Sequence, residues 1–233
     1  MEFPSPLVRG VLVRRYKRFF ADVRLEGGEV VAAHCANPGS MKTCIVEGGT
    51  VWLSRAQNPN RKLRFTWELA EIDGRRVYVN PSGANQLTLE GLKQRRIPAL
   101  AGYDLVSREV PYGVSSRIDL LLTGPRRCYV EVKNVTMDGG DSRGAFPDSV
   151  TDRGRKHLHE LIAVAARGDR AVMFFCASRE GTLAVVPADV IDPQYGKALR
   201  LAQAQGVELL AHQVCFGERA LSLGQEIPVL LPS

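Results

Sequence analysis

Turn signals divide the first third of the chain into short segments, and this spacing restricts the folds that it can adopt. The dipeptides Gly27-Gly28 and Asp73-Gly74 are typical of tight hairpins, and Pro38-Gly39 fits the centre of a type II turn. About five short strands in some 80 residues indicate a small closed barrel. An OB-like barrel is the first expectation, although the spacing equally allows an SH3-like one. β-branched and aromatic residues predict these strands within 14–25, 29–35, 49–56 and 65–80.

The pattern changes near residue 84, where helix-period segments begin to alternate with strands. This order is typical of an α/β domain with a mixed sheet. We therefore predict a two-domain α+β/α/β protein, with a basic OB-like β-barrel at 1–83 and a mixed-sheet α/β domain at 84–233. Helices are expected at 87–100, 150–168 and 193–206, and strands at 107–113, 116–124, 127–135, 170–178, 182–190 and 207–214.

The excess of positive charge lies in the predicted barrel. The formal net charge is +6; residues 1–85 carry 13 Lys or Arg against 8 Asp or Glu, whereas residues 86–233 carry 18 against 17. A nucleic acid is therefore one expected partner of the barrel.

The remaining composition bears on the compartment. No apolar run approaches the roughly 20 residues of a membrane helix, so no membrane partner is expected. The five cysteines are scattered and form no CxxC pair, which favours a reducing cytoplasm over a disulfide framework or a structural zinc.

The predicted strand at 127–135 is apolar, yet it contains Glu131 and Lys133. Side chains in a strand alternate between faces, so these two project from one face while Val130 and Val132 project from the other. Asp119 lies within the preceding apolar strand, and only a short turn separates the two strands. Antiparallel pairing would bring Asp119 close to Glu131.

Two carboxylates that converge in a sheet repel each other unless a cation lies between them. Oxygen ligands favour a hard ion, here Mg²⁺ or Mn²⁺, and a neighbouring lysine can contact the attacking water or the developing charge on a phosphate. Asp119, Glu131 and Lys133 thus form a candidate catalytic site for phosphodiester hydrolysis. The alternative is a solvated strand face, because Glu-x-Lys is a short pattern and antiparallel sheets often have one wet face.

Several segments carry a resemblance to known proteins: RYKRFFADV, HCANPGSM, TWEL, SRIDLLL, YVEVKNVT, FPDSVTDRGRKHLHEL and RAVMFF. Through them the chain resembles the bacterial sugar fermentation stimulation protein A family along nearly its whole length. Asp followed by Glu-x-Lys on adjacent strands, ahead of a helix, also resembles the PD-(D/E)xK nuclease superfamily. The resemblance implies an N-terminal OB-type domain, a C-terminal nuclease-like domain, DNA binding without marked sequence preference, and a regulatory role in sugar (maltose) metabolism.

The resemblance also implies roles for individual residues. Asp119 and Glu131 would be metal ligands, Lys133 would contact the water, and the Val132 carbonyl would complete the metal shell. A third carboxylate often comes from a preceding helix in that superfamily.

Glu90 is the best-placed candidate for this third ligand, and Glu109 is second; either could equally be a surface acid.

The helix predicted at 150–168 begins with a capping-box match, Ser149 and Asp152, although Thr151 is also a reasonable cap. Arg153, Lys156 and His157 lie on one stripe of this helix, apart from its apolar stripe. We expect Arg153 and Lys156 to contact DNA phosphates and His157 to lie around the metal site. The alternative is a solvated face with Lys156 and Glu160 as an i,i+4 pair.

The barrel offers two groups of cations. In a continuous strand, Arg14, Tyr16, Arg18 and Phe20 would share one face, and such interleaving of cations and rings suits single-strand binding. The aromatic residues could equally belong to the barrel core. An exposed loop is a second candidate for phosphate contacts, because its side chains have no packing role. Its cations are Arg55, Arg61, Lys62 and Arg64.

Three functions are compatible with these features. The first is a DNA-binding protein with a divalent-metal-dependent nuclease site, and the second is a non-enzymatic DNA-binding regulator that keeps an inactive nuclease scaffold. RNA binding through the barrel is the third. The sequence does not predict the oligomeric state.

Overall fold

The N-terminal strands form a closed barrel in the computed structural model, which describes residues 1–3, 5–58, 60–113 and 116–232. The strand order is β3-β2-β1-β4-β5-β6, and an additional parallel pairing of β3 with β5 closes β1–β5 into a ring. Alternate residues of each strand point inward, where Leu12, Leu53 and Trp67 are fully buried. The strands are β1 (Val8–Tyr16), β2 (Phe20–Leu25), β3 (Val30–His34), β4 (Thr50–Arg55), β5 (Phe65–Ile72) and β6 (Arg75–Tyr78).

The single strand expected at 14–25 is wrong, because the chain reverses inside it. Lys17 and Arg18 adopt the left-handed region, with φ of 46° and 62°, and Tyr16 pairs with Phe20 across the turn. Arg18 therefore lies in a hairpin turn and shares no strand face with Arg14.

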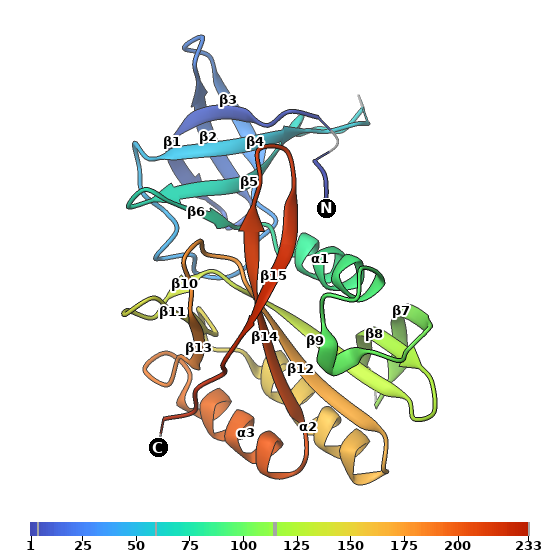
Figure 1. The fold of residues 1–233 in the computed structure, drawn as a ribbon. Helices are drawn as coiled ribbons and strands as arrows, with labels where there is room; N and C mark the ends of the chain where they lie inside the picture. Colours follow the sequence, from blue (N-terminus) through green and yellow to red (C-terminus); the bar gives the residue numbers. More distant parts are fainter. Residues whose placement is uncertain (4, 59, 114–115, 233) are drawn as a thin grey trace.

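The second domain is built on a six-stranded mixed sheet in the order β15-β14-β12-β9-β8-β7 (Figure 1). Strands β9, β12 and β14 run parallel, and the remaining pairings are antiparallel. These strands are β7 (Leu105–Tyr112), β8 (Ser116–Thr123), β9 (Cys128–Val135), β12 (Arg170–Ala177), β14 (Glu208–Phe216) and β15 (Leu221–Ile227). A smaller sheet contains β10 (Met137–Asp138), β11 (Arg143–Phe146) and β13 (Ala184–Pro187).

Helices cover both faces of the large sheet. Helix α1 (Ser82–Lys93) packs on one face, where Val130 and Val132 belong to the buried cluster. Helices α2 (Asp152–Ala166) and α3 (Pro193–Ala204) pack on the other face, which includes Tyr129 and Val135. A short 3₁₀ helix, η1 (Pro98–Leu100), follows α1. The predicted assignment of odd and even β9 residues to opposite faces is confirmed.

Helix α1 begins at Ser82, five residues before the predicted start at 87. The Asn80 side chain accepts hydrogen bonds from the Ser82 backbone N and Oγ, so it satisfies donors at the first turn. The capping box expected from Ser149 and Asp152 is wrong, and the alternative cap is the one observed. The N-cap of helix α2 is Thr151, whose side chain accepts from the Gly154 N–H at 3.0 Å. From these starting points, α1 and α2 run along opposite faces of the sheet at β9.

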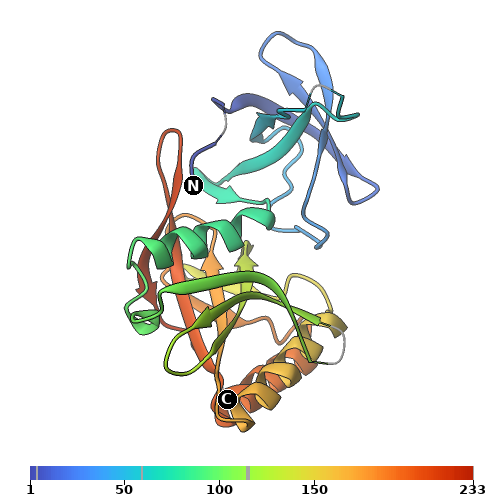
Figure 2. The same cartoon turned by 90° about the vertical axis from the view of Figure 1, so that its right-hand side faces the viewer.

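The two domains are joined by direct contacts as well as by the chain. The Tyr78 N–H donates to the Ser178 carbonyl at 2.8 Å, and Arg76 pairs with Glu180 at 2.8 Å. The β14–β15 hairpin extends alongside the barrel (Figures 1 and 2), where Arg76 donates to the carbonyl of Phe216. The β2–β3 hairpin points away from the second domain (Figure 1), so Phe20 and His34, at the other ends of these strands, lie at the end that faces it.

Within the described residues, none of the helices has the length and apolarity needed to cross a bilayer. All five cysteines fall within the described part of the chain, and each is a free thiol.

Candidate active site

Strands β8 and β9 separate at the position of the two predicted carboxylates. Their pairing ends at Leu120 and Val130, one step before Asp119 and Glu131. The Asp119 carboxylate lies in the opening, where its Oδ2 accepts from the Val132 backbone N–H at 2.7 Å. This bond satisfies a β9 donor that β8 leaves unpaired. Asp119 thus bridges the opening where the two strands separate, which is called here the fork.

Helix α1 provides the second partner of Asp119. The Asn85 side-chain amide donates to Asp119 Oδ1 at 2.8 Å. Burial raises the pKa of Asp119, and the nearby Glu131 charge raises it further, while the bonds from Val132 and Asn85 oppose the shift. The negative charges of Asp119 and Glu131 are thus unfavourable next to each other. A cation bound between them would stabilise both.

Glu131 is the most buried charged group of the site, with 2 % of its surface exposed. Lys133 Nζ lies 2.5 Å from its Oε1, and His157 Nδ1 contacts the same oxygen. Burial by itself raises the pKa of Glu131, but the Lys133 ammonium and the His157 hydrogen bond outweigh it and hold the pKa below its ordinary value. The other oxygen, Oε2, is buried and has no hydrogen-bond partner.

His157 lies between Glu131 and the solvent-exposed Arg153. Arg153 Nε donates to His157 Nε2 at 3.4 Å, which favours the tautomer that carries its proton on Nδ1, toward Glu131. His157 is thus buried against the acid, on the part of α2 that packs toward β9. His157 thus contacts the carboxylate site, while its expected place around a metal ion stays a prediction.

Glu90 does not join this group. Its carboxylate pairs with the N-terminal ammonium of Met1 and accepts from the Gln86 side chain at 2.8 Å. It lies on α1 five residues beyond Asn85, which turns it to another side of the helix. The α1 residue that contacts Asp119 is an amide rather than an acid.

Glu109 lies on the exposed edge strand β7, at the rim of a cavity of about 420 Å³. Arg153, Lys156 and His157 line the same cavity, so the two predicted phosphate-binding cations share one opening. Lys156 Nζ is also 3.8 Å from Glu160 Oε1, the i,i+4 pair considered above. Both expectations for Lys156 are therefore compatible with its position.

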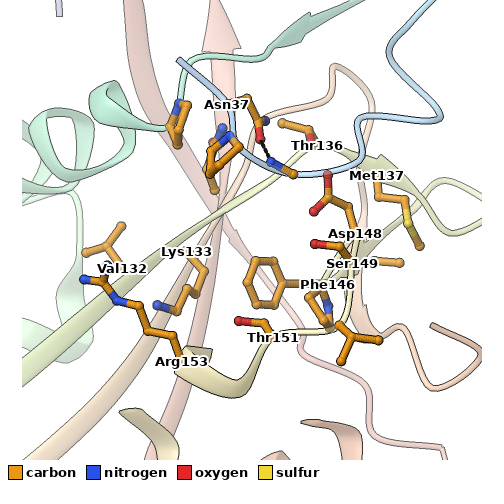
Figure 3. A pocket seen from close by; sticks show the side chains of 17 residues that line it. Asn37, Val132, Lys133, Thr136, Met137, Phe146, Asp148, Ser149, Thr151 and Arg153 are labelled. Carbon is orange, nitrogen blue, oxygen red and sulfur yellow. Dashed lines mark hydrogen bonds between the residues drawn. The ribbon is translucent and has the colours of Figure 1, made fainter. Parts of the chain in front are cut away.

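A larger cavity of about 450 Å³ opens where the two domains meet (Figure 3). Its roof is the barrel segment at Asn37, Pro38 and Gly39, its cationic end contains Lys133 and Arg153, and one wall is formed by residues 146–151. The cavity is therefore lined by residues of both domains.

The barrel residues Tyr16 and Phe20 lie outside the barrel core. Their rings stack at a centroid distance of 5.4 Å, and the Arg14 guanidinium lies 4.9 Å over the Tyr16 ring while pairing with Asp22 at 2.7 Å. Backbone pairing continues from Phe20 to His34 and from His34 to Thr66. A row of outward-facing side chains thus crosses the end of the barrel nearest the second domain.

The loop between β4 and β5 lies beside this row. Arg61 donates to Thr66 Oγ1 at 3.0 Å, and its charge, together with burial, lowers the pKa of His34. Arg55 lies over the Phe65 ring at 5.1 Å. Exposed cations of this hairpin and loop include Arg14, Lys17, Arg18, Arg55, Arg61, Lys62 and Arg64.

Fold and site together define a class: an OB-type barrel followed by a mixed-sheet α/β domain with a buried acid–lysine pair on a central strand. Family models agree with this division. The SfsA N-terminal OB domain matches residues 13–79, and the sugar fermentation stimulation protein RE domain matches residues 82–220. The chain belongs to the sugar fermentation stimulation protein family.

Relatives match over nearly full length. The sugar fermentation stimulation protein homolog of Geobacter sulfurreducens is 50% identical over 231 residues, covering 99% of each chain. That of Pelobacter propionicus is 52% identical, covering 97% of this chain and 98% of its own. Among solved structures, Pyrococcus furiosus SfsA in complex with Ca²⁺ has the same fold, with a TM-score of 0.91 and 24% identity over 99% of this chain and 98% of that one.

Three residues of the site were not foreseen from the sequence. Asn85 falls in a segment whose composition predicts a turn. For Asp148 and Arg15, the neighbouring sequence does not indicate which distant residues they contact. Asp148 accepts from the Met41 N–H at 3.0 Å, and Arg15 donates to the carbonyls of the barrel segment that roofs the cavity. Only contacts distant in sequence reveal these roles.

Proposed function

We propose that this protein binds DNA without marked sequence preference and hydrolyses its phosphodiester bonds with the help of Mg²⁺ or Mn²⁺. The observation that carries the proposal is the Glu131 carboxylate, buried next to Asp119 with Oε2 unpartnered. A buried carboxylate oxygen without a donor is costly unless a cation completes it.

The residues present fit a hard divalent ion. Asp119 and Glu131 supply carboxylate oxygens at the fork, and the Val132 carbonyl follows Glu131 directly in the sequence. Across the described ranges, no three acidic, His or Cys side chains converge on one point, so water and phosphate oxygens would complete the shell. This is the usual composition of a magnesium site, and Ca²⁺, which the Pyrococcus furiosus structure contains, prefers the same oxygen ligands.

Each residue of the site has a specific task in this proposal. When bound, the ion supplies charge stabilisation at the phosphate and lowers the pKa of a ligating water. Lys133, held against Glu131 by their ion pair, directs its ammonium toward the attacking water and the charge that develops on the phosphate. Asn85 and His157 orient the two carboxylates.

The barrel and α2 would hold the DNA backbone. Rings at Tyr16 and Phe20 offer stacking surfaces that tolerate any base, and Arg14, Arg18, Arg55, Arg61, Lys62 and Arg64 follow the phosphates. Arg153 and Lys156 continue this positive surface to the active site. The free cysteines agree with a cytoplasmic protein, where it would act in the regulation of sugar (maltose) metabolism.

Cleavage of labelled single-stranded and duplex oligonucleotides in Mg²⁺, Mn²⁺ or EDTA tests the proposal, with Glu131→Gln as the isosteric variant. We expect metal-dependent cleavage by the native protein and none by the variant. Equal cleavage by both would show a contaminating nuclease. Tight DNA binding without cleavage in any metal would favour the alternative, a DNA-binding regulator on an inactive nuclease scaffold.

A further inference from the structure

The cavity between the domains has a fixed roof, formed by residues 37–41 and called here the roof loop. Arg15 donates to the carbonyls of Asn37, Gly39 and Ser40 at 2.9, 3.0 and 3.2 Å. On the opposite side, Asp148 Oδ2 accepts from the Met41 N–H, and the Asp148 carbonyl accepts from Ser40 Oγ at 2.5 Å. The cavity shape is therefore set before any ligand arrives.

Gly39 brings the roof loop into close contact with the second domain. A Cβ built at Gly39 would lie 2.3 Å from Asp148 Oδ2, closer than atoms can approach. Asp148 uses its carboxylate on this contact rather than on a ligand. The Asp148 carboxylate in the cavity wall thus already accepts one hydrogen bond, from the Met41 N–H.

The lining of the cavity is divided into two chemically different parts. Lys133 and Arg153 place positive charge at one end, beside the catalytic fork (Figure 3). The rest mixes polar side chains, among them Asn37, Asn134 and Ser149, with apolar ones. The apolar members, called here the apolar wall, have flat or flexible faces suited to an aromatic ring: Pro38, Pro81, Met137, Phe146, Pro147 and Val150. A nucleotide has the same division, with a phosphate at one end and a base at the other.

The size of the cavity suits one nucleotide. Its volume of about 450 Å³ lies within the range of sites for small ligands. A base that enters such a cavity has left its pairing partner.

The stacking surface of the barrel leads to this cavity. His34 is the last residue of β3, and Asn37, in the roof loop, follows three residues later, a span of about 10 Å of extended chain. A strand that stacks on Tyr16 and Phe20 can therefore reach the cavity within a few nucleotides.

From these observations we propose that the cavity is a subsite for one unpaired nucleotide, whose phosphate lies against Lys133 and Arg153 and whose base lies against the apolar wall. The inference deepens the proposed nuclease function and rests on it for the scissile phosphate. It makes single-stranded DNA or an unpaired strand end the substrate.

Binding of mononucleotides to the full chain in EDTA tests the subsite without requiring cleavage. Deoxyadenosine monophosphate should bind about 5- to 100-fold more tightly than inorganic phosphate, which corresponds to the stacking of one base. Val150→Glu places a negative charge at the cavity and should weaken nucleotide binding at least about tenfold. Val190→Glu is the matched control, because Val190 does not line the cavity. Both valines are exposed, Val150 to 67% and Val190 to 95%.

Equal affinity for the nucleotide and for phosphate, or equal effects of the two substitutions, would overturn the subsite. Cleavage rates on three substrates then identify the source of the nucleotide. The substrates are a blunt duplex, a duplex with an unpaired end and a duplex with one internal unpaired nucleotide. The two substrates with unpaired nucleotides should be cut in preference to the blunt one, and Val150→Glu should slow whichever of them fills the cavity.

The subsite and the nuclease can fail separately. Nucleotide binding that is sensitive to Val150→Glu, without cleavage of any substrate, would support the subsite and reject the nuclease. Cleavage of all three substrates at one rate, unaffected by Val150→Glu, would support the nuclease and reject the subsite.

Discussion

Lys133 Nζ and Glu131 Oε1 lie 2.5 Å apart on the same face of a central strand, and the pair is almost completely enclosed. The strand period of two places both residues on this face, and the ion pair holds the ammonium against the carboxylate. Glu131 keeps Oε2 without a partner, so the pair leaves one oxygen for a further positive ligand.

Lys133→Met should slow the proposed cleavage strongly while keeping metal binding. Removal of a charge-stabilising group near the phosphate is expected to lower kcat about 100- to 1000-fold. Mn²⁺ binding, measured by calorimetry, should persist because both carboxylates remain. Lys197→Met, on the exposed side of α3, serves as the control and should leave both quantities unchanged. Loss of Mn²⁺ binding in Lys133→Met would instead indicate that the lysine only shapes the site.

Replacement of Arg61, Lys62 and Arg64 by alanine should weaken binding to every DNA sequence by a similar factor. Each lost phosphate contact should reduce the slope of log affinity against log salt by about 0.7 for a single strand. A control with Arg167, Lys197 and Arg219 changed to alanine removes the same charge from exposed positions of the other domain. If both triple variants lose affinity equally, the effect comes from net charge rather than from the loop.

Tyr16→Ala should reduce single-strand binding about 5- to 100-fold, because a base loses its stacking partner. Duplex binding should change less, since paired bases are already stacked on each other. Fluorescence titrations with a single-stranded and a duplex oligonucleotide of the same sequence measure the ratio. An equal loss for both forms would assign Tyr16 to the folding of the hairpin rather than to base contact.

Gly39→Ala should destabilise the protein by about 1–3 kcal/mol, the usual cost of forcing an extra group into a packed contact. The clash with Asp148 requires the roof loop to move, so cleavage should decline more than the change in stability explains. Chemical denaturation measures the free energy of unfolding. Gly27→Ala is the control, since a Cβ there meets nothing within 4 Å, and its free energy of unfolding should change by less than about 0.5 kcal/mol.

Glu68→Gln should stabilise the protein at neutral pH. Burial raises the pKa of Glu68, although Ser54 and Asn80 both donate to its carboxylate. The unfolded chain therefore loses its proton first as pH rises, and native stability declines from the ordinary pKa of glutamate up to the raised one. Thermal melts at several pH values should show a gain for the variant above this range and none below it. A gain that persists in acid would exclude ionisation as its cause.

Periodicity and turn chemistry were sufficient for much of the architecture. The alternation around Glu131 correctly assigned the faces of β9, and the region of the α2 start was correct, because both depend on interactions within a few residues. The cap itself is Thr151, the second choice, rather than Ser149. The reversal at Lys17 and Arg18 was missed, since neither residue is typical of a left-handed turn. Local patterns fail where the long-range pairing of strands outweighs the preference of the residue.

By itself the sequence determined which strand carries the acid and the lysine and which face they share, because these properties follow from the covalent period of the chain. Only the tertiary structure decided which groups meet them there. It brought Asn85 to Asp119, placed His157 against Glu131, and paired Glu90 with the N-terminus instead of with a metal site. Those partners lie 26 to 89 residues apart, and their meeting depends on the packing of α1 and α2 on opposite faces of one sheet.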